Sequence, residues 1–198
     1  PEQGYSGKYR DDLSGQVLMD KLVEEARAKA LLYFHSKGVW TKVPKSSARA
    51  RAGRGPISAR WVDVNKGDDQ NPNYRSRLVA TEIQRKGGNP IFASTPPLES
   101  LRTVIAIAAT DVEGQTKHVR RHDSPQRTKL SFIDISRAYF CAATDPDDPT
   151  YVELPTEDAA HGVMVGRLPK HMYGARKAAD GWHNEYAARL VPALKFAV

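Results

Sequence analysis

The chain has little of what several protein classes require. It holds one cysteine, Cys141, among 198 residues, which excludes a disulfide scaffold and a cysteine-rich zinc site and fits a reducing compartment. Its longest uninterrupted apolar run, residues 104–109, is far shorter than the roughly 18 residues that a membrane span needs. From these absences we expect a soluble intracellular protein.

Hydrophobic residues make up 40% of the chain, which is enough for one compact core or two small ones. That content excludes disorder throughout the chain. The chain begins with Pro1 and stops at Val198 directly after a helical pattern, and from this we expect a fragment of a longer protein.

Positive charge is concentrated in one part of the chain. The formal net charge is +7, and residues 37–90 hold twelve basic residues against four acidic ones. A localised basic segment is typical of proteins that bind a polyanion, because lysine and arginine neutralise phosphates and release counterions. The alternative is that these side chains are merely solvated, since residues 45–55 (KSSARARAGRG) read as a flexible loop. The residues predicted to contact nucleic acid are Arg49, Arg51, Arg54, Arg60 and Lys66.

The pattern of apolar residues predicts a mixture of helices and strands without regular β–α–β alternation, which indicates the α+β class. The predicted helices cover residues 14–37, with Ser14 as cap and Gly38 at the end, and then 98–111 and 175–190. The predicted strands cover residues 39–44, 57–65, 74–83, 129–135, 151–154 and 163–168. In the second helix, we expect Leu101, Val104, Ile105 and Ala108 to form a buried stripe.

The strands at residues 57–65 and 74–83 are separated by KGDDQNPN, a run dense in turn formers, which predicts a β-hairpin. Because side chains alternate along a strand, Arg75 and Arg77 share one face of it. Two guanidinium groups on one face can grip a phosphate chain. An exposed strand with scattered charges explains the pattern equally well.

The sharpest local signal for chemistry is residues 132–140 (FIDISRAYF). Asp134 falls at the end of an apolar strand, and an aromatic residue, Tyr139, follows five residues later. A carboxylate in that position is partly desolvated, which is costly unless it is paired or binds a metal. Taken alone, Asp134 is also explained as a cap of the turn that follows, and this is the commoner case.

Residues 132–140 resemble motif A of reverse transcriptases, and the rest of the chain is similar, in order, to the copia-type branch of LTR retrotransposons. The further matching segments are VWTKVP at 39–44, RWV at 60–62, YRSRLVA at 74–80, PPLESLRTV at 96–104, YVELP at 151–155 and MYGARKAADGW at 172–182. Each match is weak alone, but six in the right order over nearly three quarters of the chain are specific.

The resemblance implies a role for particular residues. Asp134 would bind both catalytic magnesium ions, with the Ile135 carbonyl as a neighbouring ligand. Tyr139 would be the steric gate that leaves no room for a ribose 2′-hydroxyl. The other residues implied in nucleotide binding are Arg75 and Arg77, which would hold the triphosphate, and Tyr173, Gly174 and Arg176, which match the motif B turn.

The implied architecture is a right-hand polymerase with a β-hairpin in the fingers and a small palm sheet packed on helices. Residues 1–38 would form an extension and helix, residues 39–128 a fingers-like region, and residues 129–198 a partial palm. The implied partners are an RNA template, a primer, the DNA product, deoxynucleoside triphosphates, and the integrase and RNase H segments of the parent polyprotein, with no membrane. The expected location is a virus-like particle in the cytoplasm, and the nucleus.

The chain also departs from the family pattern. In motif B the usual Leu, Gln, Pro and Arg are replaced by Ala175, Lys177, Ala179 and Asp180. The family's Asp-Asp pair, which supplies further metal carboxylates, does not follow Trp182 before Val198. We therefore expect this polypeptide alone not to polymerise DNA, because one carboxylate cannot hold two divalent ions against water. The alternative function is that of a degenerate, non-catalytic nucleic-acid-binding remnant.

Overall fold

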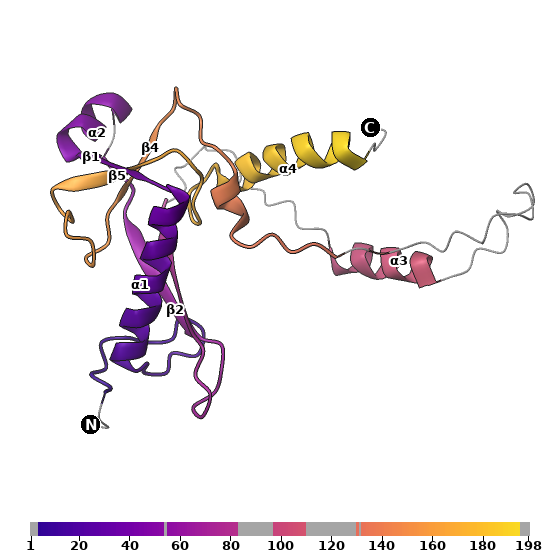
Figure 1. Cartoon of the computed structure of the whole chain (residues 1–198), viewed down its shortest axis with the longest axis horizontal. Coiled ribbons are helices and arrows are strands. Elements are labelled where there is room, and N and C mark those ends of the chain that lie inside the picture. The colour runs from indigo at the N-terminus through magenta and orange to yellow at the C-terminus, as the bar shows by residue number, and fades with distance from the viewer. Residues whose placement is uncertain (1–3, 54, 83–96, 110–129, 131, 195–198) are drawn as a thin grey trace, which may run out of the picture. The chain divides into compact units, whose positions relative to one another are not determined.

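The computed structural model describes residues 4–53, 55–82, 97–109, 130 and 132–194. The chain divides into two compact units, and each is described by itself. The main unit comprises residues 1–92 and 137–198, and the second unit comprises residues 93–136. Helices and short antiparallel strands alternate irregularly along the chain (Figure 1), which confirms the predicted α+β class.

The predicted hairpin forms in the main unit. Strand β2 (Ala59–Asn65) pairs antiparallel with β3 (Tyr74–Ala80), and Trp61 lies opposite Leu78. Along β3, Leu78 is buried and Arg77 is exposed, as the alternation predicted. The outer edge of β2 is covered by the N-terminal segment, because carboxylate oxygens of Asp11 and Asp12 accept the N–H groups of Asn65 and Asp63.

A second sheet brings together strands that are distant in sequence. Its order is β1 (Thr41–Pro44), β5 (Met164–Leu168), β4 (Thr150–Glu153), and both pairings are antiparallel. The predicted strands at 39–44, 151–154 and 163–168 are thereby confirmed, with shifts of one or two residues at their ends. Ile57 joins this sheet to the hairpin, because its N–H donates to Tyr151 and its carbonyl accepts from Glu153, both at 2.8 Å.

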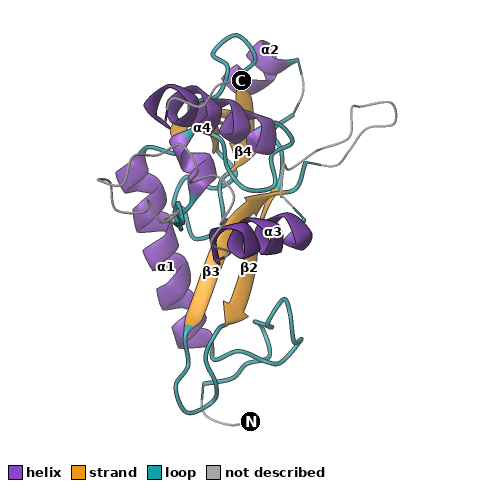
Figure 2. Ribbon diagram, turned by 90° about the vertical axis from the view of Figure 1, so that its right-hand side faces the viewer, coloured by secondary structure: helices purple, strands orange, loops and turns teal. Residues whose placement is uncertain are grey.

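Helix α1 (Asp20–Lys37) packs along β3 (Figure 2). Its predicted start at Ser14 was wrong, because the Asp11 carboxylate accepts the N–H groups of Leu13 and Ser14 and holds this segment in a turn. Its predicted end was right. Gly38 takes a left-handed conformation with φ 58° and donates its N–H to the last turn of the helix.

The core of the main unit lies where helix, hairpin and three-stranded sheet meet. It contains buried side chains from every one of these elements and from the short 3-10 helix η2 (Ala138–Cys141). Its largest members are Phe34, Trp40, Leu78, Phe140, Leu168 and Met172. Gly166 in β5 lets the Trp40 indole pack directly on the sheet, since a Cβ there would lie 3.0 Å from the Trp40 Cβ.

The predicted flexible loop at residues 45–55 was wrong over most of its length. Residues Lys45–Ala52 form helix α2, which ends at Gly53 with φ 62°. Alternating alanines favour helix here, and Ala48 is fully buried against Tyr151 and Val165. The helix therefore forms because it has a sheet to pack on, which the sequence of the segment does not reveal.

In the second unit, helix α3 (Leu98–Ala109) forms close to its predicted bounds, but the predicted buried stripe does not. Leu101, Val104 and Ile105 are all exposed. The predicted strand at 129–135 was also wrong for the residues described there, which are extended without strand pairing. A strand exists only where a neighbour takes up its backbone hydrogen bonds, and no described strand pairs with this segment.

Helix α4 (Ala178–Leu194) ends the described chain and begins three residues later than predicted. Trp182 and Tyr186 stack on each other with ring centroids 5.7 Å apart. Across the part of the chain that the structure describes, no helix combines the length and apolar character needed to cross a membrane.

A partly buried ionic network ties α1 to the hairpin and to the loop after β4. The Arg27 guanidinium donates to Asp63 at 2.6 Å and to Glu157 at 2.7 Å, and Glu157 also accepts from the Trp61 indole at 2.9 Å. Burial alone would raise the pKa of Glu157, but the hydrogen bonds from Trp61 and Arg27 outweigh it and lower that pKa.

We expect Arg27→Met to destabilise the protein by about 3 kcal/mol, because it leaves the buried Asp63 carboxylate without its cation and removes the more exposed pair with Glu157. The measurement is the free energy of unfolding in urea. The matched control is Arg189→Met, which removes an exposed pair with Glu185 on α4 and is expected to change stability by about 0.5 kcal/mol or less. Equal losses in the free energy of unfolding would show that the Arg27 network stabilises the protein no more than an exposed ion pair does.

Candidate nucleic-acid interface

The turn after β5 docks on the end of β3. The Ala80 N–H donates to the Tyr173 carbonyl at 2.8 Å, and the Arg176 N–H donates to the Glu82 carboxylate at 2.8 Å. Gly174 has φ +82°, and a Cβ on it would lie 1.9 Å from the Ala80 carbonyl oxygen. Only glycine permits this approach, so the glycine of the predicted motif B turn has a physical explanation.

Three tyrosines, Tyr33, Tyr139 and Tyr173, surround Phe140 beside this turn, and we call them the tyrosine cluster. The Tyr139 and Tyr173 rings lie 4.7 Å apart, and Phe140 lies within 6.2 Å of both Tyr33 and Tyr173. The 3-10 turn of η2 places Phe140 in the core and leaves Tyr139 half-buried. The predicted steric gate and the predicted motif B tyrosine are therefore in direct contact.

Two arginines lie near the tyrosine cluster. Burial raises the pKa of Tyr173, while the positive charges of Arg77 and Arg137 act in the opposite direction. Since burial dominates, the Tyr173 hydroxyl stays protonated at neutral pH and remains a hydrogen-bond donor. The Arg137 guanidinium itself stacks on Tyr33, with its Cζ 3.7 Å from the ring centroid.

The arginines of the hairpin share the face that does not carry Leu78. Arg77 lies opposite Val62, Arg75 opposite Val64 and Arg60 opposite Val79, and directly opposed residues point to the same side of an antiparallel pair. The Arg60 Nη1 atom forms an ion pair with the Asp12 Oδ1 atom at 2.9 Å. Within the described chain, Arg75 and Arg77 form no ion pair, so both guanidinium groups are available to a ligand.

The other residues predicted to contact nucleic acid lie on separate elements of the main unit. Arg49 and Arg51 are exposed on α2, and Lys66 is exposed at the start of the hairpin turn. Arg54 lies outside the described residues. The exposed arginines of α2 are held on a short rigid helix, which suits repeated contacts along a phosphate backbone better than a loop does.

Asp134 and Ile135 belong to the second unit, in the extended segment before η2, and both are exposed. The described residues contain no group of three histidine, cysteine, aspartate or glutamate side chains that could hold a metal ion. Magnesium needs several oxygen ligands, and Asp134 with the Ile135 carbonyl offers too few. Their role as metal ligands stays a prediction.

Sequence reasoning missed two members of this site, Arg137 and Glu82. Arg137 lies inside the segment that matches motif A, but its left-handed backbone and its stack on Tyr33 arise only from packing. Glu82 follows the hairpin and fixes the backbone of Arg176. No pattern in the sequence distinguishes Tyr33 from the other residues of its helix.

The chain was also compared with known proteins. No protein-family model, no curated protein and no solved structure matches it. The function is therefore argued from the motifs and the geometry of the site.

Two glycines with nearly the same φ allow a test of how closely the turn at Gly174 docks on β3. Gly174 and Gly162 have φ of +82° and +81°, but a Cβ on Gly162 would meet nothing within 4 Å. We expect Gly162→Ala to destabilise the protein by about 1 kcal/mol, the cost of a left-handed alanine. Gly174→Ala should cost about 2 kcal/mol more, because the turn must separate from Ala80. Urea denaturation of both variants measures the difference, and equal losses would contradict the docking argument.

Proposed function

We propose that this chain is part of a copia-type RNA-directed DNA polymerase and that its main unit holds the incoming nucleotide and the template. One observation carries the proposal. The resemblance links three distant stretches of sequence to nucleotide binding, and contacts in the main unit connect them. Tyr139 lies against Tyr173, and the turn with Tyr173, Gly174 and Arg176 docks on the end of β3, the strand that carries Arg77.

The chemistry of these side chains suits a deoxynucleoside triphosphate. Arg77 and its neighbour Arg75 present planar guanidinium groups, which bind phosphate oxygens in pairs. Tyr139 lies against Tyr173, and this contact limits the positions its ring can take. A bulky ring held in one place would exclude a ribose 2′-hydroxyl, which is the expected role of a steric gate. The fingers would then correspond to the hairpin, and the palm to the segments around η2 and the turn.

In this proposal, Asp134 would bind magnesium only as part of a complete polymerase. Asp134 precedes Arg137 by three residues, so an extended chain keeps the two Cα atoms within about 11 Å of each other. Further carboxylates would have to join Asp134 to complete a site for divalent ions.

The second candidate function is nucleic-acid binding without chemistry, as in a decayed polymerase. One observation favours it: Lys177, which stands where the family has glutamine, forms an exposed ion pair with Asp148. The Lys177 side chain thus contacts a carboxylate rather than a base pair. The two candidates are separated by reading the coding frame beyond codon 198, because an Asp-Asp pair between apolar residues is expected only for the polymerase.

We expect the protein to bind a primer–template duplex with strong salt dependence. Replacing Arg49 and Arg51 together by alanine should weaken binding and reduce the slope of log K against log salt by about two, since two phosphate contacts are lost. Fluorescence anisotropy at several salt concentrations measures the slope. Arg189→Ala removes an arginine from α4 and should leave the slope unchanged. Asp134→Asn should also bind as the unmodified chain does, because it alters no phosphate contact.

We expect the purified chain to show no magnesium-dependent nucleotide incorporation in a primer-extension assay. The physical reason is that Asp134 and one carbonyl cannot hold two divalent ions against water. Incorporation that Asp134→Asn abolishes would contradict this expectation and would mean that the chain assembles a complete metal site.

A further inference from the structure

Arg137 adopts a backbone conformation that arginine rarely takes. Its φ of 54° and ψ of 47° are left-handed, and no other described residue except glycine has a positive φ. Such a conformation costs free energy and persists only where the surrounding structure imposes it. It begins the 3-10 turn of η2 and directs the side chain of Arg137 to α1, where the guanidinium stacks on Tyr33.

The Arg137 guanidinium is partly withdrawn from water and lacks a counter-ion. Its Nη1 atom is buried and has no hydrogen-bond partner in the described part of the chain. Burying part of a charged group without a partner is unfavourable, so a folded protein normally supplies a carboxylate or carbonyl. Arg137 has neither among the described residues, although the residue as a whole is only half-buried and can be reached from solvent.

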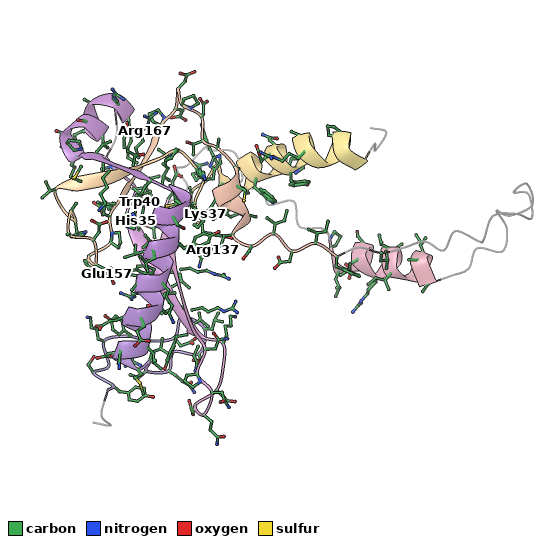
Figure 3. The ribbon with its side chains drawn as sticks, viewed as in Figure 1. His35, Lys37, Trp40, Arg137, Glu157 and Arg167 are labelled. Atoms are coloured by element: carbon green, nitrogen blue, oxygen red, sulfur yellow. The ribbon has the colours of Figure 1, made fainter. Side chains whose placement is uncertain are left out.

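Other cations gather around the same tyrosines. The Lys37 ammonium lies 5.7 Å from the Tyr33 ring centroid, and Figure 3 shows Lys37 and Arg137 near the carboxyl end of α1. Arg77 and Arg137 both act on the hydroxyl of Tyr173. No carboxylate pairs with Lys37, Arg77 or Arg137 within the described residues. Two positive charges, on Lys37 and Arg137, thus lie over the Tyr33 ring and form a surrounding that attracts an anion.

A purely structural explanation accounts for part of this charge. The carboxyl end of a helix carries partial negative charge and attracts cations. The Lys170 ammonium serves this purpose, since it donates to the Lys37 carbonyl at 2.7 Å, and the Gly38 N–H caps the same turn. Arg137 makes no such bond to the helix end in the described chain, so helix capping does not explain it.

We propose that Arg137, stacked on Tyr33 with Lys37 beside the same ring, is a binding residue for a phosphoryl group. Stacking occupies the face of the guanidinium and leaves its in-plane N–H bonds unused. Partial burial strengthens the attraction, because water competes less with the anion. The proposal rests on the proposed function for the source of the phosphate, which is either a nucleoside triphosphate or a nucleic-acid strand.

The test uses the whole chain and two probes, inorganic tripolyphosphate and a single-stranded oligodeoxynucleotide, in the presence of EDTA. Arg137→Asn removes the charge and keeps a residue that tolerates a left-handed backbone. We expect it to weaken binding of at least one probe about tenfold or more, as the loss of a charged hydrogen bond predicts. Arg189→Asn removes an exposed arginine from α4 and should change neither affinity by more than about twofold.

The two probes identify the source of the phosphate. A loss confined to tripolyphosphate supports the triphosphate of a nucleotide, and a loss confined to the oligonucleotide supports a strand backbone. Unchanged binding of both probes by a folded Arg137→Asn variant would overturn the proposal. If that variant does not unfold cooperatively in urea, Arg137→Gly replaces it, because glycine adopts positive φ freely.

The outcomes separate this proposal from the proposed function. A chain that binds tripolyphosphate through Arg137 but does not bind a primer–template would refute the polymerase assignment and keep the anion site. A chain that binds the primer–template through α2, but whose Arg137→Asn variant binds both probes normally, would refute the anion site and keep the assignment.

Discussion

The carbonyl oxygen of Ala80 occupies the position where a side chain at residue 174 would begin, and this close approach fixes much of the main unit. Because residue 174 is glycine, the turn can hydrogen-bond to the end of β3, and Tyr173 lies against Tyr139. The hairpin, η2 and the turn before α4 are thus held as one surface. Without this contact, the arginines of the hairpin and the tyrosines would belong to unrelated parts of the chain.

Charge in the main unit is divided between two kinds of environment. Where cations serve the fold, as Arg27 does, they are buried and satisfied by carboxylates within 2.7 Å. Where they face the candidate site, as Arg75 and Arg77 do, the described chain gives them no carboxylate. An excess of unpaired guanidinium groups destabilises a compact state by repulsion unless an anion binds there. The proposed function and the proposed role of Arg137 both depend on cations that have no carboxylate partner in the described chain.

The main unit by itself lacks Asp134, the predicted catalytic carboxylate, which belongs to the second unit. Asp134 lies in a segment without strand pairing to any described residue, and the apolar residues beside it, Phe132 and Ile133, are exposed. A catalytic carboxylate works only when its backbone is held in place, which a neighbouring strand would do. Binding of phosphate is therefore what we propose for the main unit alone, whereas metal-dependent chemistry would require further carboxylates.

The sequence by itself determined the local elements whose signals are short in range. The alternation in residues 74–80 and the turn formers before them predicted the hairpin, and Gly38 predicted the end of α1. It also identified Arg77, Tyr139, Tyr173 and Gly174 as candidate site residues. Only the tertiary structure decided that residues 45–52 are helical, that residues 132–135 pair with no described strand, and that Arg137 is left-handed beside Tyr33. The reason is that each of these depends on contacts between residues far apart in the chain, and neither periodicity nor propensity encodes such contacts.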